Sequence, residues 1–324
     1  MAKRLNLGIL GPGAIAAKMA ATLAKMSSAR LYAVASRDGE RSRAFADGHG
    51  AEKAYASYEG LLDDPAVDLV YVATPNTFHH AHIRLCLEHG KPVLCEKPFT
   101  MTADEAEDAI ALARRKGLFL AEAIWTRYLP FCRTVRELLD GGAVGRLAVL
   151  TGSLGNNVQT MPRIHDPALG GGALMDLGVY LLNFAAMFLG SDLEPIGAAC
   201  VRHASGLDLQ TSLTLANRDG RFAVLHAAVA ADTGRQAMIA GERGYLLVEN
   251  LINPQSARLF STSRVPGRSF ASPPQITGFE YEVEAAARAL GAGEIECPEM
   301  PHGEIVRIMR QIDDFRARLE IPLP

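Results

Sequence analysis

A lysine and an acid–tyrosine pair are the side chains in this sequence best suited to exchanging a proton with a substrate oxygen. Lys97 stands in Cys95-Glu96-Lys97-Pro98, directly after the short apolar run Val93-Leu94, which predicts a buried strand. A lysine at the carboxyl end of a buried strand adds little stability, but open α/β sheets bind ligands beyond their strand ends. We therefore expect Lys97 to face a bound ligand.

Asp176 and Tyr180 follow the glycines Gly170-Gly171-Gly172 and lie four residues apart, so they share one face of a predicted helix. The residues that flank them are apolar. An acid in such surroundings needs a partner, because a buried charge is costly unless it is paired. We expect Lys97 to be that partner. The alternative is an exposed acid and an interfacial tyrosine on an otherwise apolar helix.

These side chains predict proton transfer that accompanies hydride transfer. Oxidising an alcohol by hydride loss requires loss of the hydroxyl proton, and reducing a carbonyl requires its gain. A tyrosine, with a pKa of about 10, is a poor base at neutral pH, but a neighbouring lysine cation favours the phenolate. In this scheme Asp176 would keep Lys97 protonated.

A glycine-rich turn near the start of the chain predicts a dinucleotide site. Gly11-Pro12-Gly13-Ala14-Ile15-Ala16 follows an apolar strand and opens a helix, so it fits the G-x-G-x-x-G/A pattern with Ala16 in the third position. Glycines allow the backbone to approach a pyrophosphate, whose charge the helix N-terminus favours. Gly11, Gly13, Ala14 and Ile15 are the predicted contacts.

The tip of the second strand, Ser36-Arg37-Asp38, favours NADP over NAD. An NAD site usually has an acidic residue at this tip, whereas a guanidinium suits a 2′-phosphate. Ser36 and Arg37 are therefore predicted cofactor contacts. A shift of one residue would instead place Asp38 on the ribose, which leaves NAD possible, and both charges could also be solvated loop residues.

Two further strand ends are expected at the same edge of the sheet. Thr74, Asn76 and His79 follow one predicted strand, while Glu96 and Lys97 follow the next, and we assign all five to the cofactor site. The alternative role of His79 is to start the helix that follows. His79, His80 and His82 do not predict a metal site, because adjacent histidines diverge on a helix and no carboxylate or thiol is spaced to join them.

The order of predicted elements divides the chain into two domains. Residues 1–123 alternate strands (5–10, 31–35, 69–73, 93–95, 118–121) with helices (14–26, 40–49, 79–89, 103–116), which predicts a Rossmann-type parallel sheet. Residues 124–324 predict an α+β domain with a large, mostly antiparallel sheet, helices near 130–140, 172–189, 278–291 and 302–319, a hairpin at 217–220, and a surface loop over 262–277.

Charge, cysteine spacing and one strand pattern indicate the binding partners that we expect, which are small molecules and further copies of the chain. The net charge of −3 gives no reason to expect a nucleic-acid or membrane partner, and no apolar run approaches the roughly 20 residues of a membrane helix. Five cysteines without a CxxC spacing fit reduced thiols in the cytoplasm. Alternating Leu209, Leu213 and Leu215 suggest an open apolar sheet face, and hence a homodimer or higher oligomer.

The motifs together resemble those of the glucose–fructose oxidoreductase/inositol dehydrogenase (Gfo/Idh/MocA) family over nearly the whole chain. They are Gly11-x-Gly13-x-x-Ala16, Thr74-Pro75-Asn76-x-x-His79, Glu96-Lys97-Pro98 and Gly171-Gly172-x-x-x-Asp176-x-Gly178-x-Tyr180. Tyr180 and the stretch 122–128 resemble the dihydrodiol dehydrogenase and NADP-dependent D-xylose dehydrogenase branch. Many relatives instead have histidine at the Tyr180 position and aspartate at the Asn183 position, which argues against a histidine base here.

The resemblance implies that Lys97 and Tyr180 serve the reacting oxygen, that Asp176 orients the substrate and that Trp125 walls the pocket. For Trp125, packing between domains is an equal alternative. The expected function is NADP-dependent hydride transfer to or from a sugar, cyclic polyol or dihydrodiol. A regulator that binds NAD(P) without turnover is the competing class, and it would be expected to lack Lys97 or the Asp176/Tyr180 face.

Overall fold

The computed structural model describes residues 4–323, which divide into two compact units. The first runs from the start of the described chain to Ile124 and includes Gln275–Val306, and the second comprises Trp125–Pro274 and the chain from Arg307 onward. We predicted one division, between residues 123 and 124, whereas the structure returns residues 275–306 to the first unit. The amphipathic pattern of a helix does not say which sheet it covers, so the sequence could not show this return.

The sheet of the first unit, as described, has the strand order β3-β2-β1-β4-β5-β6, with all neighbours parallel. This is the doubly wound order of dinucleotide-binding sheets, in which ligands bind beyond the carboxyl ends of the strands. The strands are β1 (Leu5–Leu10), β2 (Ala29–Ala35), β3 (Lys53–Tyr55), β4 (Leu69–Val72), β5 (Val93–Glu96) and β6 (Leu120–Ala123). The predicted parallel sheet is confirmed; only the short β3 was missed.

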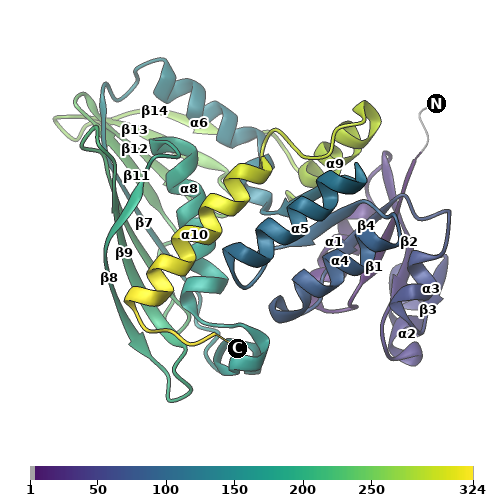
Figure 1. The fold of residues 1–324 in the computed structure, drawn as a ribbon. Coiled ribbons are helices and arrows are strands. Elements are labelled where there is room, and N and C mark those ends of the chain that lie inside the picture. Colours follow the sequence, from purple (N-terminus) through teal and green to yellow (C-terminus); the bar gives the residue numbers. More distant parts are fainter. Residues whose placement is uncertain (1–3, 324) are drawn as a thin grey trace. The chain divides into compact units, whose positions relative to one another are not determined.

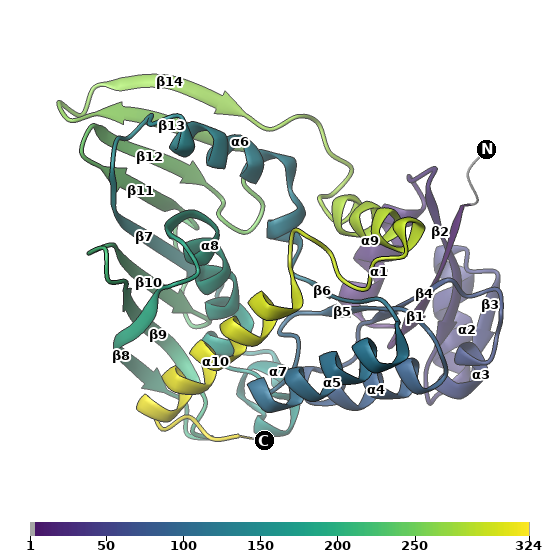
Figure 2. The same ribbon diagram turned by 45° about the horizontal axis from the view of Figure 1, so that its top comes forward.

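Helices cover both faces of this sheet, with α4 and α5 on one side and α1 and α9 on the other (Figure 2). They are α1 (Ala14–Leu23), α2 (Gly39–His49), α3 (Tyr58–Leu62), α4 (His79–Glu88), α5 (Ala103–Lys116) and α9 (Glu280–Ala292). Thr102 caps α5 by accepting the N–H of Glu105 at 3.2 Å. The segment that includes α9 is joined to the sheet by the N–H of Leu120, which donates to Ile295 at 3.0 Å.

The second unit has a mostly antiparallel sheet ordered β14-β13-β12-β11-β7-β10-β9-β8 in the described chain, with only β7 and β10 parallel (Figure 1). The strands are β7 (Leu147–Gly155), β8 (Glu194–Arg202), β9 (Asp208–Ala216), β10 (Phe222–Ala228), β11 (Ala237–Gly241), β12 (Gly244–Glu249), β13 (Ser256–Ser261) and β14 (Pro266–Ala271). The predicted β9–β10 hairpin is present, but the predicted loop over 262–277 contains β14, whose residues are mostly exposed.

Helices pack on one face of this sheet, and no helix of residues 4–323 covers the other face (Figures 1 and 2). They are α6 (Pro130–Asp140), the short α7 (Pro162–His165), α8 (Val179–Leu189) and, from Arg307 on, α10 (His302–Arg318). Leu213 and Leu215 are buried beneath them, so the predicted apolar stripe faces the core. The exposed large apolar side chains of β8 and β10 are instead Ile196, Val201, Phe222 and Val224.

Among the described residues, one helical stretch is long and apolar enough to cross a membrane by length and composition: Pro167–Leu189, which has 23 residues and a window of mean hydropathy 1.6. It corrects our expectation that no apolar run approaches membrane-spanning length. Its most apolar window is 94% buried inside the protein, as for the core helix of a globular unit.

Candidate active site

The glycine turn after β1 has the backbone that a dinucleotide requires. Gly11 has a φ of 90°, and a Cβ there would lie 2.9 Å from Cγ2 of Thr74. A Cβ at Gly13 would meet nothing within 4 Å, and this residue is the N-cap of α1, where no side chain caps the helix. The N-terminus of α1 is therefore left for an anionic ligand, so the turn fits a pyrophosphate.

The tip of β2 separates the roles of Arg37 and Asp38. Asp38 caps α2 and accepts the backbone N–H groups of Glu40 at 3.0 Å and Arg41 at 3.2 Å, while Ser36 is buried and accepts the N–H of Asp38. Arg37 is exposed, with its guanidinium carbon 5.8 Å from the centroid of the Phe78 ring. The carboxylate of Asp38 is already used to cap α2. Of the two charged residues at this tip, Arg37 is therefore the one that takes no part in capping.

A second guanidinium lies near this tip and was missed in the sequence. Arg41 donates to the carbonyl oxygen of Pro12, in the glycine turn, at 3.3 Å. The sequence feature that could have indicated Arg41 is its position four residues after Arg37, in the first turn of the predicted helix.

His79 is a buried structural residue rather than an open cofactor contact. Its ring is fully buried, with Nδ1 2.8 Å from the carbonyl oxygen of Pro98 and Nε2 2.9 Å from that of Thr74. Burial lowers its pKa. His79 thus joins the turns after β4 and β5 and begins α4, which confirms its expected role at the start of a helix, whereas its burial argues against the predicted contact with the cofactor. Asn76, half-buried in the turn before it, stays a predicted contact.

The turn after β5 is built around a buried carboxylate. Glu96 is 6% exposed and accepts the hydroxyl of Tyr71 and, at 3.1 Å, the backbone N–H of Lys97. The Lys97–Pro98 peptide bond is cis, and Lys97 is half-buried at the carboxyl end of β5. Glu96 therefore supports the turn that presents Lys97.

Tyr180 and Trp125 are joined within the second unit. The indole N–H of Trp125 donates to the Tyr180 hydroxyl at 3.2 Å, and Trp125 is half-buried. Asp176 lies in a π-helical turn, Leu174–Gly178, that leads into α8, where we predicted a regular α-helix. Such turns are rare and often occur at functional sites. Lys97 belongs to the first unit, so its pairing with this face stays a prediction.

Asp176 has a partner that sequence reasoning missed. Arg163, in α7, holds both carboxylate oxygens, with N–O distances of 3.0 and 3.2 Å. Lys97 stays the further partner that we predict for Asp176. Arg163 lies thirteen residues earlier in a stretch without periodicity, so only the fold brings the two side chains together.

A buried aspartate fixes the start of the helical stretch that carries Asp176 and Tyr180. Asp208, at the start of β9, is 1% exposed and accepts the backbone N–H of Leu174 at 2.7 Å and the hydroxyl of Thr211. Gly172 has a φ of 98°, and a Cβ there would overlap Oδ1 of Asp208. The glycine run is therefore needed for close packing at this point.

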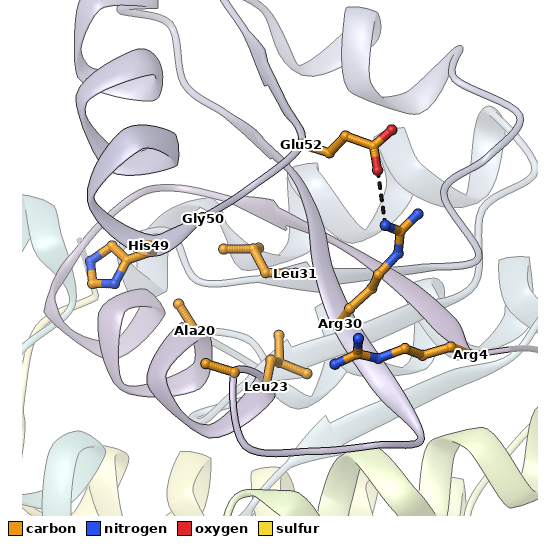
Figure 3. A pocket seen from close by; sticks show the side chains of 9 residues that line it. Arg4, Ala20, Leu23, Arg30, Leu31, His49, Gly50 and Glu52 are labelled. Carbon is orange, nitrogen blue, oxygen red and sulfur yellow. Dashed lines mark hydrogen bonds and ion pairs between the residues drawn. The ribbon is translucent and has the colours of Figure 1, made fainter.

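We also searched the described residues for metal sites and for other pockets. No group of three or more His, Cys, Asp or Glu able to hold a metal occurs among residues 4–323. A pocket of about 260 Å³ lies where β1 and β2 begin, away from the glycine turn (Figure 3). Arg4 and Arg30 line it, and Arg30 pairs there with Glu52 at 2.9 Å.

Comparison with known proteins agrees with this geometry. Residues 5–123 match the oxidoreductase family with an NAD-binding Rossmann fold, and residues 132–247 match the Gfo/Idh/MocA C-terminal domain. The trans-1,2-dihydrobenzene-1,2-diol dehydrogenases of Macaca fuscata fuscata and Homo sapiens are 33% and 32% identical, covering 99% of this chain and 98% of each of theirs. The chain belongs to the Gfo/Idh/MocA oxidoreductase family.

Solved structures of this family share the fold over almost the entire chain. A 3-ketoreductase from Actinomadura kijaniata, in complex with NADP and TDP-benzene, is 28% identical with a TM-score of 0.89, covering 97% of this chain and 98% of that one. An aldose-aldose oxidoreductase from Caulobacter crescentus is 24% identical with a TM-score of 0.88, covering 98% of both chains, and shows the fold alone. The predicted family, fold class and enzyme class are thus confirmed, as is a nicotinamide dinucleotide as the cofactor.

Proposed function

We propose that this oxidoreductase interconverts a carbonyl and an alcohol on a sugar, cyclic polyol or dihydrodiol, with NADP as the preferred cofactor. The observation that carries the proposal is the Tyr180 hydroxyl, held by the Trp125 indole one turn from Asp176. Dehydrogenases named for a dihydrodiol among the relatives support this substrate range.

The cofactor preference is supported by the tip of β2. Asp38 is used as the cap of α2, whereas Arg37 is exposed and Arg41 lies beside the glycine turn. Guanidinium groups bind phosphate oxygens through charge-assisted hydrogen bonds, which suits the 2′-phosphate of NADP. The NADP bound to the Actinomadura kijaniata ketoreductase is consistent with this preference.

A bound nicotinamide dinucleotide, held by the glycine turn and Arg37, would supply the hydride chemistry, and the side chains of the protein would move the proton. Tyr180 gives a proton to the substrate oxygen during reduction and takes it back during oxidation. The indole N–H of Trp125 stabilises the negative charge that the tyrosine oxygen then carries. The turn that Glu96 supports presents Lys97, and the proposal assigns to this lysine the role of a cation that acts on the same oxygen.

A screen of NADPH absorbance with aldoses, anhydro-sugars, diketones and dihydrodiols, in both directions, tests the activity. Tyr180→Phe and Lys97→Met should each lower kcat by about 10²–10⁴, the usual cost of removing a positioned acid–base group. The double variant should lose much less than the product of both losses, because the two groups act as a unit. NADPH affinity, measured by fluorescence, should change little. Near-normal kcat in both single variants would overturn the proposed mechanism.

We further infer that the protein works as a homodimer or higher oligomer in the cytoplasm. The uncovered face of the second sheet carries Ile196, Val201, Phe222 and Val224, and such exposed apolar groups favour a protein partner. A second copy of the chain is the partner that we propose for this face.

A further inference from the structure

Two side chains of one short helix contact the same face of α8. The short helix is η2 (Trp125–Tyr128), a 3₁₀ turn at the start of the second unit. Its Trp125 donates to the Tyr180 hydroxyl at 3.2 Å, and its Arg127 donates from Nε to Oδ1 of Asn183 at 2.6 Å. Tyr180 and Asn183 are three residues apart on α8, so their side chains share a face of that helix. The contact between the indole and the proposed acid–base tyrosine therefore has a second contact beside it.

Asn183 uses both ends of its amide. The side chain is fully buried, and while Oδ1 accepts from Arg127, Nδ2 donates to the carbonyl oxygen of Val179 at 2.9 Å. Val179 directly precedes Tyr180, so one side chain ties the backbone beside Tyr180 to the turn that carries Trp125. An asparagine can do this because its amide has a donor and an acceptor, whereas a leucine has neither and an ionised aspartate has acceptors alone.

A third side chain anchors η2 at a different point. Thr126 is fully buried and donates its hydroxyl to the carbonyl oxygen of Ile252 at 2.6 Å. One such hydrogen bond fixes a point of a short helix but not the rotation of the helix about that point. The contact between Arg127 and Asn183 supplies a further point, on α8. Its loss should therefore rotate η2 rather than release it, and the rotation would move the Trp125 indole away from the tyrosine hydroxyl.

We propose that Asn183 is a positioning residue for the acid–base tyrosine: by holding Arg127, it keeps the indole N–H of Trp125 directed at the Tyr180 hydroxyl. The inference goes beyond the proposed function and rests on it, because Asn183 acts through the residue to which that function assigns the proton. We assign no proton transfer to Asn183 itself.

The intrinsic fluorescence of the protein measures the position of the indole directly, because Trp125 is the only tryptophan in the sequence. Asn183→Leu keeps a side chain of similar size without either hydrogen-bonding group. It should change the emission maximum of the free protein and lower kcat about three- to tenfold, the usual effect of one lost hydrogen bond, while KM for NADPH stays within about twofold. Asn183→Asp keeps an acceptor for Arg127, so it should retain the wild-type emission and a kcat between the two.

A second comparison asks whether Asn183 acts through the indole. Trp125→Phe removes the indole donor, so adding Asn183→Leu to it should lower kcat by less than about twofold. Phe188→Leu is the matched control for a smaller side chain in the core of α8. Phe188 is 1% exposed, and its ring packs on that of Phe184 with centroids 4.7 Å apart. This control should leave both kcat and the emission unchanged when measured well below the unfolding transition.

The outcomes separate this inference from the proposed function. Unchanged emission or unchanged kcat in Asn183→Leu would overturn the inference and leave the proposed function standing. An undiminished loss of kcat in the Trp125→Phe background would also overturn it, since Asn183 would then act without the indole. Near-normal kcat in Tyr180→Phe would remove the proton-transfer role of the tyrosine, and with it the role of Asn183, whatever the emission shows. If Asn183→Leu fails to fold, Asn183→Ser, whose shorter side chain cannot contact both partners, decides by the same measurements.

Discussion

Replacing Asp208 by alanine should destabilise the second unit and lower activity together. The substitution removes the acceptor of the Leu174 N–H and of the Thr211 hydroxyl, both in buried surroundings. A hydrogen bond to a charged group contributes about 1.5–3 kcal/mol, so two of them bring the gross loss to about 3–6 kcal/mol.

Part of this loss is offset by a cost that the native side chain carries. Burial raises the pKa of Asp208, and its Oδ1 has no hydrogen-bond partner within residues 4–323. Removing a carboxylate that is only partly satisfied returns some desolvation energy. We therefore expect a net loss of about 2–4 kcal/mol in the free energy of unfolding, combining both terms. Asp208→Asn keeps an acceptor for the Leu174 N–H, so it should lose about 1 kcal/mol.

Urea unfolding measures these values, and kcat measured well below the unfolding transition reports whether the helix start also positions the active-site residues. Asp208→Ala should lower kcat about tenfold or more, while NADPH affinity, which depends on the first unit, stays within twofold. Asp219→Ala is the control, because Asp219 is exposed in the β9–β10 turn and should change stability by less than about 0.5 kcal/mol. Unchanged stability in Asp208→Ala would refute the reasoning, as would full activity in a destabilised variant.

Three further predictions follow from the first unit and from the uncovered sheet. Arg37→Ala should weaken NADP binding at least tenfold and NAD binding less than twofold by fluorescence titration, and equal losses would contradict the assignment of the 2′-phosphate. Burial disfavours the charged form of the Asp64 carboxylate and so raises its pKa. Hydrogen bonds from Tyr55 at 2.7 Å and Lys53 at 2.9 Å outweigh this effect and hold the pKa of Asp64 well below its ordinary value. The stabilisation by the ionised Asp64 should be complete above about pH 4 and lost as the pH falls further. The difference in the free energy of unfolding between wild type and Asp64→Asn, measured with urea, should therefore narrow from pH 6 to 3. A difference that stays constant would exclude this linkage. Light scattering at micromolar concentration should show a dimer or larger species that Val224→Glu weakens, and a monomeric wild type would rule the oligomer out.

Most of the first unit could be predicted element by element, because most of its strands are short apolar runs. The short β3 and α3 lack such a pattern and were missed, and α9 was assigned to the other unit. Asp38 shows the limit of this approach. The sequence left Asp38 as a ribose ligand or a solvated charge, and only the hydrogen bonds from the N–H groups of Glu40 and Arg41 show that it caps α2. His79 shows the same limit, because the position of a histidine after a strand does not reveal whether its ring faces a ligand or two backbone carbonyls.

The second unit was predicted less completely, for a physical reason. Its edge strands, such as β14, are polar and exposed, so they lack the alternation that marks a half-buried strand. The contacts of Arg163 and Asp208 with the active-site helix join residues that are distant in the sequence. Periodicity and motif spacing report only on neighbours along the chain, so they predicted Asp176 and Tyr180 but neither residue that holds them in place.

The return of residues 275–306 to the first unit has a consequence for how the protein is made. The described chain passes between its two units after residues 124, 274 and 306. On α9, Val283 and Ala286 are fully buried, and they belong to the first unit. During synthesis, the dinucleotide-binding unit therefore cannot complete its core until nearly the whole polypeptide has been made. An N-terminal fragment that ends at residue 124 would lack this helix, so a soluble version of the unit should require residues 275–306 to be fused to it.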